Sequence, residues 1–456
     1  MMALLTLTLP FLGALVCALL PPAWSRWLAL VASVGTALCL KLMLKHPEAI
    51  PHSLGHDPLT TTLLIITALF IPFIIVGTWS KAYSKGVYAS LLATEGALIG
   101  LFCAQNALIF YTFWELALLP SIYMTYTAST SDKVKSITWR FLLYSLAGGL
   151  AMLTGFLYLG AAHDTFNIAA LCSLSLPLAT SKWIFVALFA AFAVKTPLIP
   201  FHGWQPDTYE ASPYPATLVL AVLLSKMGIY GLLRFYPLLH PVIVAWHPYL
   251  LALGTLGCLY AAFLAFTQTS LKRFIAYSSI SHLSMIVLGI FSTTSDGIYG
   301  ATFQVVSHCV TTFGLFLAAF ILSHRRGSED LADFGGVASQ APLFAGLFLV
   351  VVMASVALPF TSGFIGEFLI LKGLFHMNPF IASAAGLTLI LGAAYMLKLN
   401  QSLFYGKNDS NTLYALLPQE RLLLSLTAVA AVVLGLYPTP LLNFLGHFIS
   451  TLGGLQ

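Results

Sequence analysis

The sequence predicts an all-α, polytopic membrane protein with about fourteen transmembrane helices. Of its 456 residues, 59% are hydrophobic and only 8% are charged, whereas a soluble domain carries about 25% charged residues. Apolar runs of roughly 17–25 residues, a length that crosses a bilayer as a helix, follow one another along nearly the whole chain. Because the connections are short and no long polar stretch interrupts them, residues 1–456 are expected to form a single transmembrane domain.

The expected spans follow these apolar runs in chain order. The first run lacks the basic residues that precede the apolar part of a cleavable signal peptide, so it is interpreted as the first span. The spans are 3–20, 27–44, 60–79, 87–104, 106–127, 137–160, 182–198, 214–236, 246–267, 272–292, 299–323, 341–374 (broken), 379–404 and 420–446.

The basic residues predict an orientation in the membrane. Twelve lysines and arginines fall in one set of alternate loops and five in the other. By the positive-inside rule the richer set is cytoplasmic, so both termini are expected on the outer side of a cell inner (cytoplasmic) membrane. The richer set is Arg26, Lys81, Lys85, Lys133, Lys135, Arg140, Lys272, Arg273, Arg325, Arg326, Lys407 and Arg421; the poorer set is Lys41, Lys45, Lys182, Arg234 and Lys372.

One stretch in the middle of the chain, 187–234, carries two lysines inside apolar segments. Lys195 is followed at once by Pro197 and Pro200, and Lys226 lies near the middle of the next apolar segment. A charge in the hydrocarbon layer costs at least a few kcal/mol, so such lysines usually line a bundle interior or an ion path. Proline removes a backbone donor and interrupts the helix, which favours a discontinuous helix of the kind found in transporters. The alternative is that each lysine extends its ammonium to a membrane interface.

A second break is expected at 359–363, four residues before Glu367. The helix after this break carries Lys398, as the helix after the first break carries Lys226. Lys398 either extends a polar axis or reaches the cytoplasmic surface. Two broken helices five spans apart suggest two inverted five-helix repeats, since an odd number of spans reverses the orientation. The expected repeats are 87–236 and 246–404, with flanking helices in 1–79 and 420–446.

Glu115 lies among aromatic residues in the fifth expected span. A carboxylate in apolar surroundings is stabilised by a nearby ammonium, and Lys195 is the natural partner in the same half of the chain. Protonating the acid, or moving the lysine away, changes the proton affinity of the other group and can drive uptake and release. The alternative is a static buried ion pair that serves only packing.

Two histidines, His282 and His308, each lie beside a serine in consecutive apolar spans. Histidine suits a proton relay because its unperturbed pKa is nearest neutrality, although a single histidine in an apolar helix is more often structural. Together with the acids and lysines they suggest a polar axis along the middle of the membrane. The residues predicted to carry proton translocation are Glu115, Lys195, Lys226, His282, His308 and Glu367.

Other kinds of site find no support in the sequence. The six cysteines all fall inside apolar runs without paired short spacing, so neither a disulfide framework nor a metal site is expected. There is no glycine-rich nucleotide motif and no iron–sulfur spacing. The net charge of +5 comes from loop residues and does not indicate a nucleic-acid partner.

Several long motifs resemble the antiporter-like membrane subunits of respiratory complex I, the NADH:quinone oxidoreductase. The resemblance extends from about residue 57 to residue 440, and the glutamate at Glu367 is similar to the M-type (subunit 4-like) members, since sister subunits usually have lysine there. The motifs that carry it are FWE at 113–115, AFAVKTPLIPFHGWQPD at 191–207, LLSKMGIYGLLRF at 223–235, LKRFIAYSSISHLSM at 271–285 and LPFTSGFIGEFLIL at 358–371.

The resemblance implies proton translocation coupled to electron transfer in other subunits. By motif, Glu115 and Lys195 are implied to be a modulating pair, Lys226 with His282 and His308 a central connection, and Glu367 the proton carrier on the exit side. The implied partners are neighbouring antiporter-like and other membrane subunits and the lipid bilayer. Quinone and NADH would bind to other subunits, so no cofactor is expected on this chain.

Two alternatives are compatible with the same residues. The chain could belong to a multisubunit cation/proton antiporter, a membrane hydrogenase or a related ion-translocating complex, which would work without NADH. It could also be a scaffold that holds distal subunits together and moves no protons, in which case its buried charges would tolerate neutral replacement.

Overall fold

The computed structural model describes residues 2–45, 57–406 and 414–452. Within these ranges the regular secondary structure is helical, with no β-strand. Twelve of the described helices or continuous helix runs are long and apolar enough to cross a membrane, and three shorter apolar helices accompany them. The predicted all-α, polytopic class is therefore confirmed, whereas the count of fourteen spans and the two inverted repeats stay predictions.

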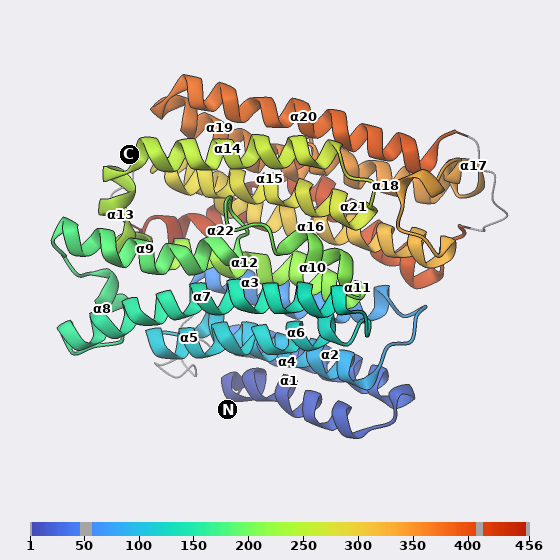
Figure 1. The fold of residues 1–456 in the computed structure, drawn as a ribbon, viewed down its shortest axis with the longest axis horizontal. Helices are drawn as coiled ribbons and strands as arrows, with labels where there is room; N and C mark the ends of the chain where they lie inside the picture. Colours follow the sequence, from blue (N-terminus) through green and yellow to red (C-terminus); the bar gives the residue numbers. More distant parts are fainter. Residues whose placement is uncertain (1, 46–56, 407–413, 453–456) are drawn as a thin grey trace. The chain divides into compact units, whose positions relative to one another are not determined.

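The described chain divides into two compact units. Unit 1 contains most of 2–196 together with 211–245, and unit 2 contains 197–210 and 246–451, each within the described ranges. The helices of unit 1 (Figure 1) are α1 (Met2–Leu19), α2 (Pro22–Lys45), α3 (Pro58–Gly77), α4 (Lys85–Cys103), α5 (Ala107–Leu116), α6 (Leu118–Tyr126), α7 (Asp132–His163), α8 (Ile168–Cys172), α9 (Leu178–Lys195), α11 (Tyr214–Val219), the π-helix η2 (Leu220–Leu224), α12 (Ser225–Arg234) and α13 (Tyr236–Ala245).

Unit 2 is built around α16, which packs against α15, α18, α19, α21 and α22. A second contact series joins α15 to α14 and α14 to α20, and Figure 1 shows these helices side by side. The helices of this unit are α10 (Gln205–Ala211), α14 (His247–Phe266), α15 (Leu271–Phe291), α16 (Ser295–Arg326), the 3₁₀-helix η3 (Leu331–Asp333), α17 (Val337–Gln340), α18 (Pro342–Ser355), α19 (Ser362–Met377), α20 (Pro379–Phe404), α21 (Pro418–Leu436) and α22 (Thr439–Ile449).

Both predicted helix breaks are present. The helix α9 ends at Lys195 and no helix begins again before Gln205, and α18 ends at Ser355 before α19 begins at Ser362. Proline follows the last helical residue within a few positions in each case, at Pro197 and at Pro359. The chain therefore leaves the helical conformation beside Lys195 and again shortly before Glu367.

Two further interruptions were not expected from the sequence. The fifth span is divided into α5 and α6 at Ala117, because Pro120 has no backbone N–H to bond the carbonyl of Leu116, four residues earlier. The last expected span, 420–446, is two helices. α21 stops at Leu436 because Pro438 disfavours the helical conformation of the residue before it.

A partly buried ion pair fixes one end of unit 1. Asp57 caps α3 by accepting a hydrogen bond from the Thr60 backbone N–H at 2.8 Å. The other carboxylate oxygen pairs with Arg234 at the end of α12, with 2.6 Å between the guanidinium nitrogen and Oδ2. Arg234 also donates to Gln105 Oε1 at 3.0 Å, so one side chain joins the start of α3, the turn after α4 and the end of α12.

Lys398 differs from Lys226 in its surroundings. The Lys226 side chain is buried in unit 1, whereas Lys398 is exposed on α20. An exposed lysine near the end of an apolar helix fits the interpretation that it reaches a membrane surface.

The helices α16 and α19 pack so closely at Gly300 that a larger residue there should destabilise the protein. A Cβ atom at Gly300 would lie 2.5 Å from the Ile370 backbone nitrogen and 2.7 Å from the Gly366 carbonyl oxygen, so backbone would have to move. We expect Gly300→Ala to lower the free energy of unfolding by about 1–3 kcal/mol. The check is the temperature at which the detergent-solubilised chain loses solubility.

The matched control is Gly386→Ala in α20, where a Cβ would meet nothing within 4 Å. Because alanine favours helix over glycine by up to about 1 kcal/mol, this variant should be as stable as the unchanged chain or more so. Equal behaviour of the two variants would contradict the close-packing account.

Candidate functional site

Lys195 is the last residue of α9 and points into unit 1. Its side chain is only 3% exposed. Among the described residues, the Nζ atom has no hydrogen-bond partner, and the nearest aromatic ring, that of Phe141 on α7, has its centroid 5.8 Å away. An ammonium in this position is shielded from bulk solvent and has no direct counter-ion in the described part of the chain.

Glu115, on α5, lies against the same helix α7 as Lys195, but at a different height along the helix axis. Gly149 leaves the space that the carboxylate occupies, since a Cβ built there would overlap with Glu115 Oε1. Glu115 and Lys195 act electrostatically on each other, but neither Oε1 nor Nζ has a hydrogen-bond partner in the described part of the chain. The predicted pair is therefore close without being in direct contact.

One face of α7 lies between the two charged groups. Phe141, Ser145 and Gly149 are spaced four residues apart and so share this face. Phe141 faces Lys195 and Gly149 faces Glu115, which puts Ser145 at the intermediate level. The Ser145 hydroxyl is buried and has no hydrogen-bond partner in the described chain, so it is available to a group between acid and base.

Lys226 follows directly after a π-helical turn. In η2 the Ser225 backbone N–H bonds the carbonyl of Leu220 instead of that of Ala221. The Ala221 carbonyl consequently accepts from the Ser225 hydroxyl at 2.8 Å and from Lys226 Nζ at 2.8 Å. The wider turn thus creates a binding position for a buried ammonium, and such turns occur often at functional sites.

The ends of the two lysine-bearing helices meet within unit 1. A Cβ atom at Gly228 on α12 would overlap with the Thr196 side chain and lie 2.9 Å from the Thr196 backbone nitrogen. Glycine therefore allows α12 to approach the last turn of α9, next to Lys195, while Lys226 lies two residues before the contact. Glu115, Lys195 and Lys226 therefore all belong to this unit, with the helices of the two lysines in contact next to Lys195.

The acid of unit 2, Glu367, is directly hydrogen-bonded. It is 2% exposed on the second turn of α19. Its Oε1 atom lies 2.8 Å from Nδ1 of His282 on α15 and accepts from Nε2 of Gln304 on α16 at 3.1 Å. Two helices, α15 and α16, therefore each contribute one polar side chain to the carboxylate that a third helix, α19, carries.

His308 continues this group along α16. Its Nε2 atom lies 3.0 Å from the Ser279 hydroxyl, and the rings of His308 and His282 have centroids 6.1 Å apart. One helical turn separates His308 from Gln304, so both project from the same face of α16. His282, His308 and Glu367, predicted from the sequence, thus lie together with Gln304 and Ser279.

The six predicted residues therefore fall into two groups, with three in each unit. Gln304, Ser279, Ser145 and the π-helical turn were not predicted. The four-residue spacing of Gln304 and His308 in an apolar helix is a signal that could have identified Gln304. Both groups combine buried acids with buried bases, an arrangement suited to holding and transferring protons.

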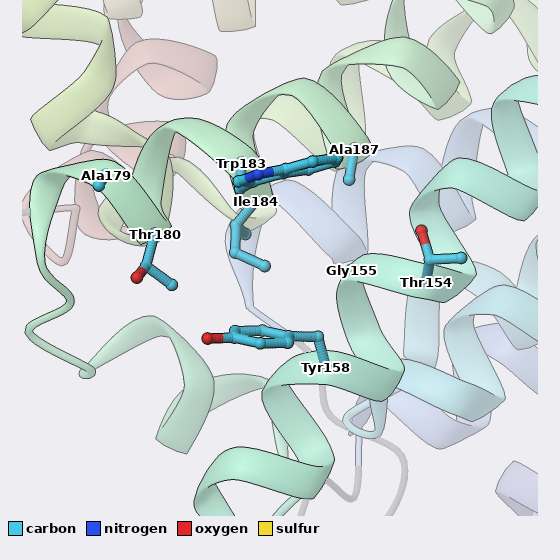
Figure 2. Close-up of a pocket in the computed structure, with 8 residues that line it drawn as sticks. All are labelled: Thr154, Gly155, Tyr158, Ala179, Thr180, Trp183, Ile184 and Ala187. Atoms are coloured by element: carbon cyan, nitrogen blue, oxygen red, sulfur yellow. The ribbon is translucent and has the colours of Figure 1, made fainter.

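One pocket of unit 1 lies away from these residues. It has a volume of about 470 Å³ and is formed between α7 and α9. Figure 2 shows Tyr158 from α7 on one side and Trp183 from α9 on the other. None of the predicted translocation residues lines it, and its walls are mainly apolar. The chemistry of the site therefore belongs to the buried side chains between the helices and not to this surface pocket.

Comparison with known proteins gives consistent results. Residues 104–392 match the family described as NADH:quinone oxidoreductase/Mrp antiporter, TM. Subunit M of the NADH-quinone oxidoreductase from Rickettsia typhi is 35% identical over 397 residues, which are 85% of this chain and 80% of that protein. Subunit M from Rhodobacter capsulatus is 30% identical over 462 residues, with 94% and 90% covered.

Solved structures have the same fold. A chain of respiratory complex I from Thermus thermophilus superposes with a TM-score of 0.89 at 30% identity, covering 99% of this chain and all of that one. A chain of the Mrp complex from Dietzia has a TM-score of 0.88 at 18% identity, with 99% and 97% covered, and shows the shared fold. This chain belongs to the antiporter-like membrane subunits of NADH:quinone oxidoreductase, within the group named subunit M or chain 4.

Proposed function

We propose that this chain translocates protons across the inner membrane, driven by electron transfer in other subunits of an NADH:quinone oxidoreductase. Membership of the family supports the setting. The observation that carries the proposal is the position of Lys195, whose side chain is buried at the break after α9 and whose Nζ atom has no hydrogen-bond partner among the described residues. A buried charge of this kind is expensive in a membrane and is usually functional.

In unit 1 the proposed step is a coupled change in the protonation of Glu115 and Lys195. When Glu115 is ionised, its charge stabilises a protonated Lys195. When Glu115 takes up a proton, that stabilisation is lost and Lys195 releases its own proton more readily. Lys226, held by the Ala221 carbonyl and the Ser225 hydroxyl, is the proposed acceptor, because its helix meets the end of α9 at Gly228.

In unit 2 the proposed step is a proton transfer between histidine and carboxylate. His282 and Glu367 already share a hydrogen bond of 2.8 Å, so a proton can move along it without rearrangement of the helices. His308 and Ser279 extend the path by a second bond of 3.0 Å. Gln304 donates to the same carboxylate oxygen as His282 and fixes its orientation.

The partners belong to the same proposal. Neighbouring antiporter-like and other membrane subunits would hold the chain, while NADH and quinone would bind elsewhere in the complex and leave this chain without a cofactor. Both termini are proposed to lie on the outer side of the membrane, as the distribution of lysine and arginine indicates.

The first test is Glu115→Gln in the complete complex. Assembly should persist on a native gel, because the glutamine fits the space left by Gly149. Proton pumping and coupled electron transfer in inverted vesicles should fall together by about tenfold or more, the effect of losing about 1.4 kcal/mol at the rate-limiting barrier.

Asp132→Asn is the matched control. Asp132 pairs with Lys135 at 3.1 Å but is 99% exposed, and exposed pairs contribute at most about 1 kcal/mol. Pumping should be unchanged in this variant. If Glu115→Gln also pumps normally, the proposal for unit 1 is wrong and the chain is better described as a scaffold.

A second test addresses unit 2 through Gln304→Leu. The substitution removes a donor to Glu367, and a hydrogen bond to a charged group is worth about 1.5–3 kcal/mol. Pumping per electron transferred should fall by about tenfold or more. The same change at Gln401, which is exposed on α20, should have no effect. Equal pumping by the two variants would show that the Gln304 bond has no part in translocation.

A further inference from the structure

Unit 1 contains another buried acid, Glu95, that the proposed proton path does not use. It lies in the middle of α4 and is 0% exposed. In the described part of the chain neither of its carboxyl oxygens has a hydrogen-bond partner. The neighbouring Thr94 hydroxyl is turned away, since it donates to the Ser90 carbonyl at 2.8 Å.

The other buried glutamates of the membrane helices are held differently. Glu367 accepts from Gln304 and shares a hydrogen bond with His282. Glu420 is 1% exposed, and its Oε2 atom lies 2.5 Å from Arg325 and accepts from the Leu417 N–H at 2.9 Å. Each of these carboxylates has donors that can stabilise a negative charge. Within the described ranges, Glu95 has neither a hydrogen-bond donor nor a cation as partner, which is the arrangement that least tolerates ionisation.

Among the described residues, no cation lies close enough to stabilise a negative charge on Glu95. The helices packed against α4 are α1, α2, α3, α5, α6 and α11. Their only acidic or basic side chains among the described residues are Arg26, Lys41 and Lys45 on α2 and Glu115 on α5. Lys41 and Lys45 are exposed, and Arg26 lies over the Trp79 ring with 4.4 Å to its centroid. Among the described residues, none of these groups forms a hydrogen bond with either carboxyl oxygen of Glu95.

Glu95 nevertheless lies at nearly the same depth as Glu115. The helices α4 and α5 form a hairpin in which Gly100 packs against the Phe113 ring. Glu95 is five residues before Gly100 and Glu115 two after Phe113, so both lie in the same direction from this contact. At 1.5 Å per residue, their depths differ by about 4.5 Å, which is less than one helical turn.

We propose that Glu95 is a second proton-binding site of unit 1, which carries its proton in the state described here and during turnover transfers it to the ionised carboxylate of Glu115, leaving Glu95 ionised until it is protonated again. The geometry supports a neutral carboxyl group at this position, placed one helix away from the Glu115 site. The release step rests on the proposed function, whereas the presence of the proton in the resting state does not.

The test is infrared difference spectroscopy on the assembled complex. Spectra of the resting complex should contain the carbonyl band of a protonated carboxyl group that shifts in heavy water and is lost in Glu95→Gln. The same band should decrease when NADH starts turnover. Asp132→Asn is the control: it should leave this band unchanged, because that carboxylate is 99% exposed and pairs with Lys135.

Glu95→Leu is a second variant, needed because Glu95→Gln could fail to assemble only because the glutamine amide does not fit the site. A neutral buried carboxyl group can be replaced by an apolar side chain of similar size without loss of assembly, whereas an ionised group with a hidden partner cannot. Assembly of Glu95→Leu at the level of the unchanged complex is therefore expected.

Three results would overturn the proposal. If the protonated carbonyl band is absent at rest, or if Glu95→Leu prevents assembly, Glu95 is ionised and structural. If the band is present but does not change during turnover, Glu95 holds a permanent proton and is no part of translocation. All three results leave the effect of Glu115→Gln on pumping intact, so failure here is separable from failure of the proposed function.

Discussion

The free-energy cost of a charge in the hydrocarbon layer is the constraint on which this structure depends. Charged residues make up 8% of the chain, and the few that lie inside the membrane helices need local compensation. The described units provide it in three ways: a direct ion pair between Arg325 and Glu420, a widened helical turn at Lys226, and an electrostatic interaction across a gap at Lys195.

These three solutions differ in how easily they can be changed. The pair of Arg325 and Glu420 is reinforced by a backbone N–H and would cost several kcal/mol to break, so it is suited to holding α16 and α21 together. Lys195 has no such bonds to lose. A titratable side chain that is stabilised only by the electric field of a second charged side chain can gain or lose a proton when that second charge changes. Proton translocation requires this property.

The sequence predicted what is encoded locally. The breaks after Lys195 and before Glu367 follow from nearby prolines, whose effect on the backbone depends on adjacent residues alone. The burial of the lysines, histidines and glutamates followed from the apolar residues around them. Contacts between distant segments were harder to predict from the sequence. Gln304 and Glu367 are 63 residues apart, and their hydrogen bond depends on how α16 and α19 pack. No residue type predicts the π-helical turn before Lys226. Glu95 was not predicted as a site because a single acidic residue in an apolar helix forms no recognisable sequence pattern.

The most direct measurement is a double-mutant cycle on Glu115 and Lys195, with proton pumping by the assembled complex as the readout. If the two residues act as one unit, Glu115→Gln and Lys195→Met should each reduce pumping strongly, and the double variant should be no worse than the more severe single one. If the losses multiply in the double variant, the two groups contribute independently, and the claim that they exchange stabilisation across the α7 face is wrong.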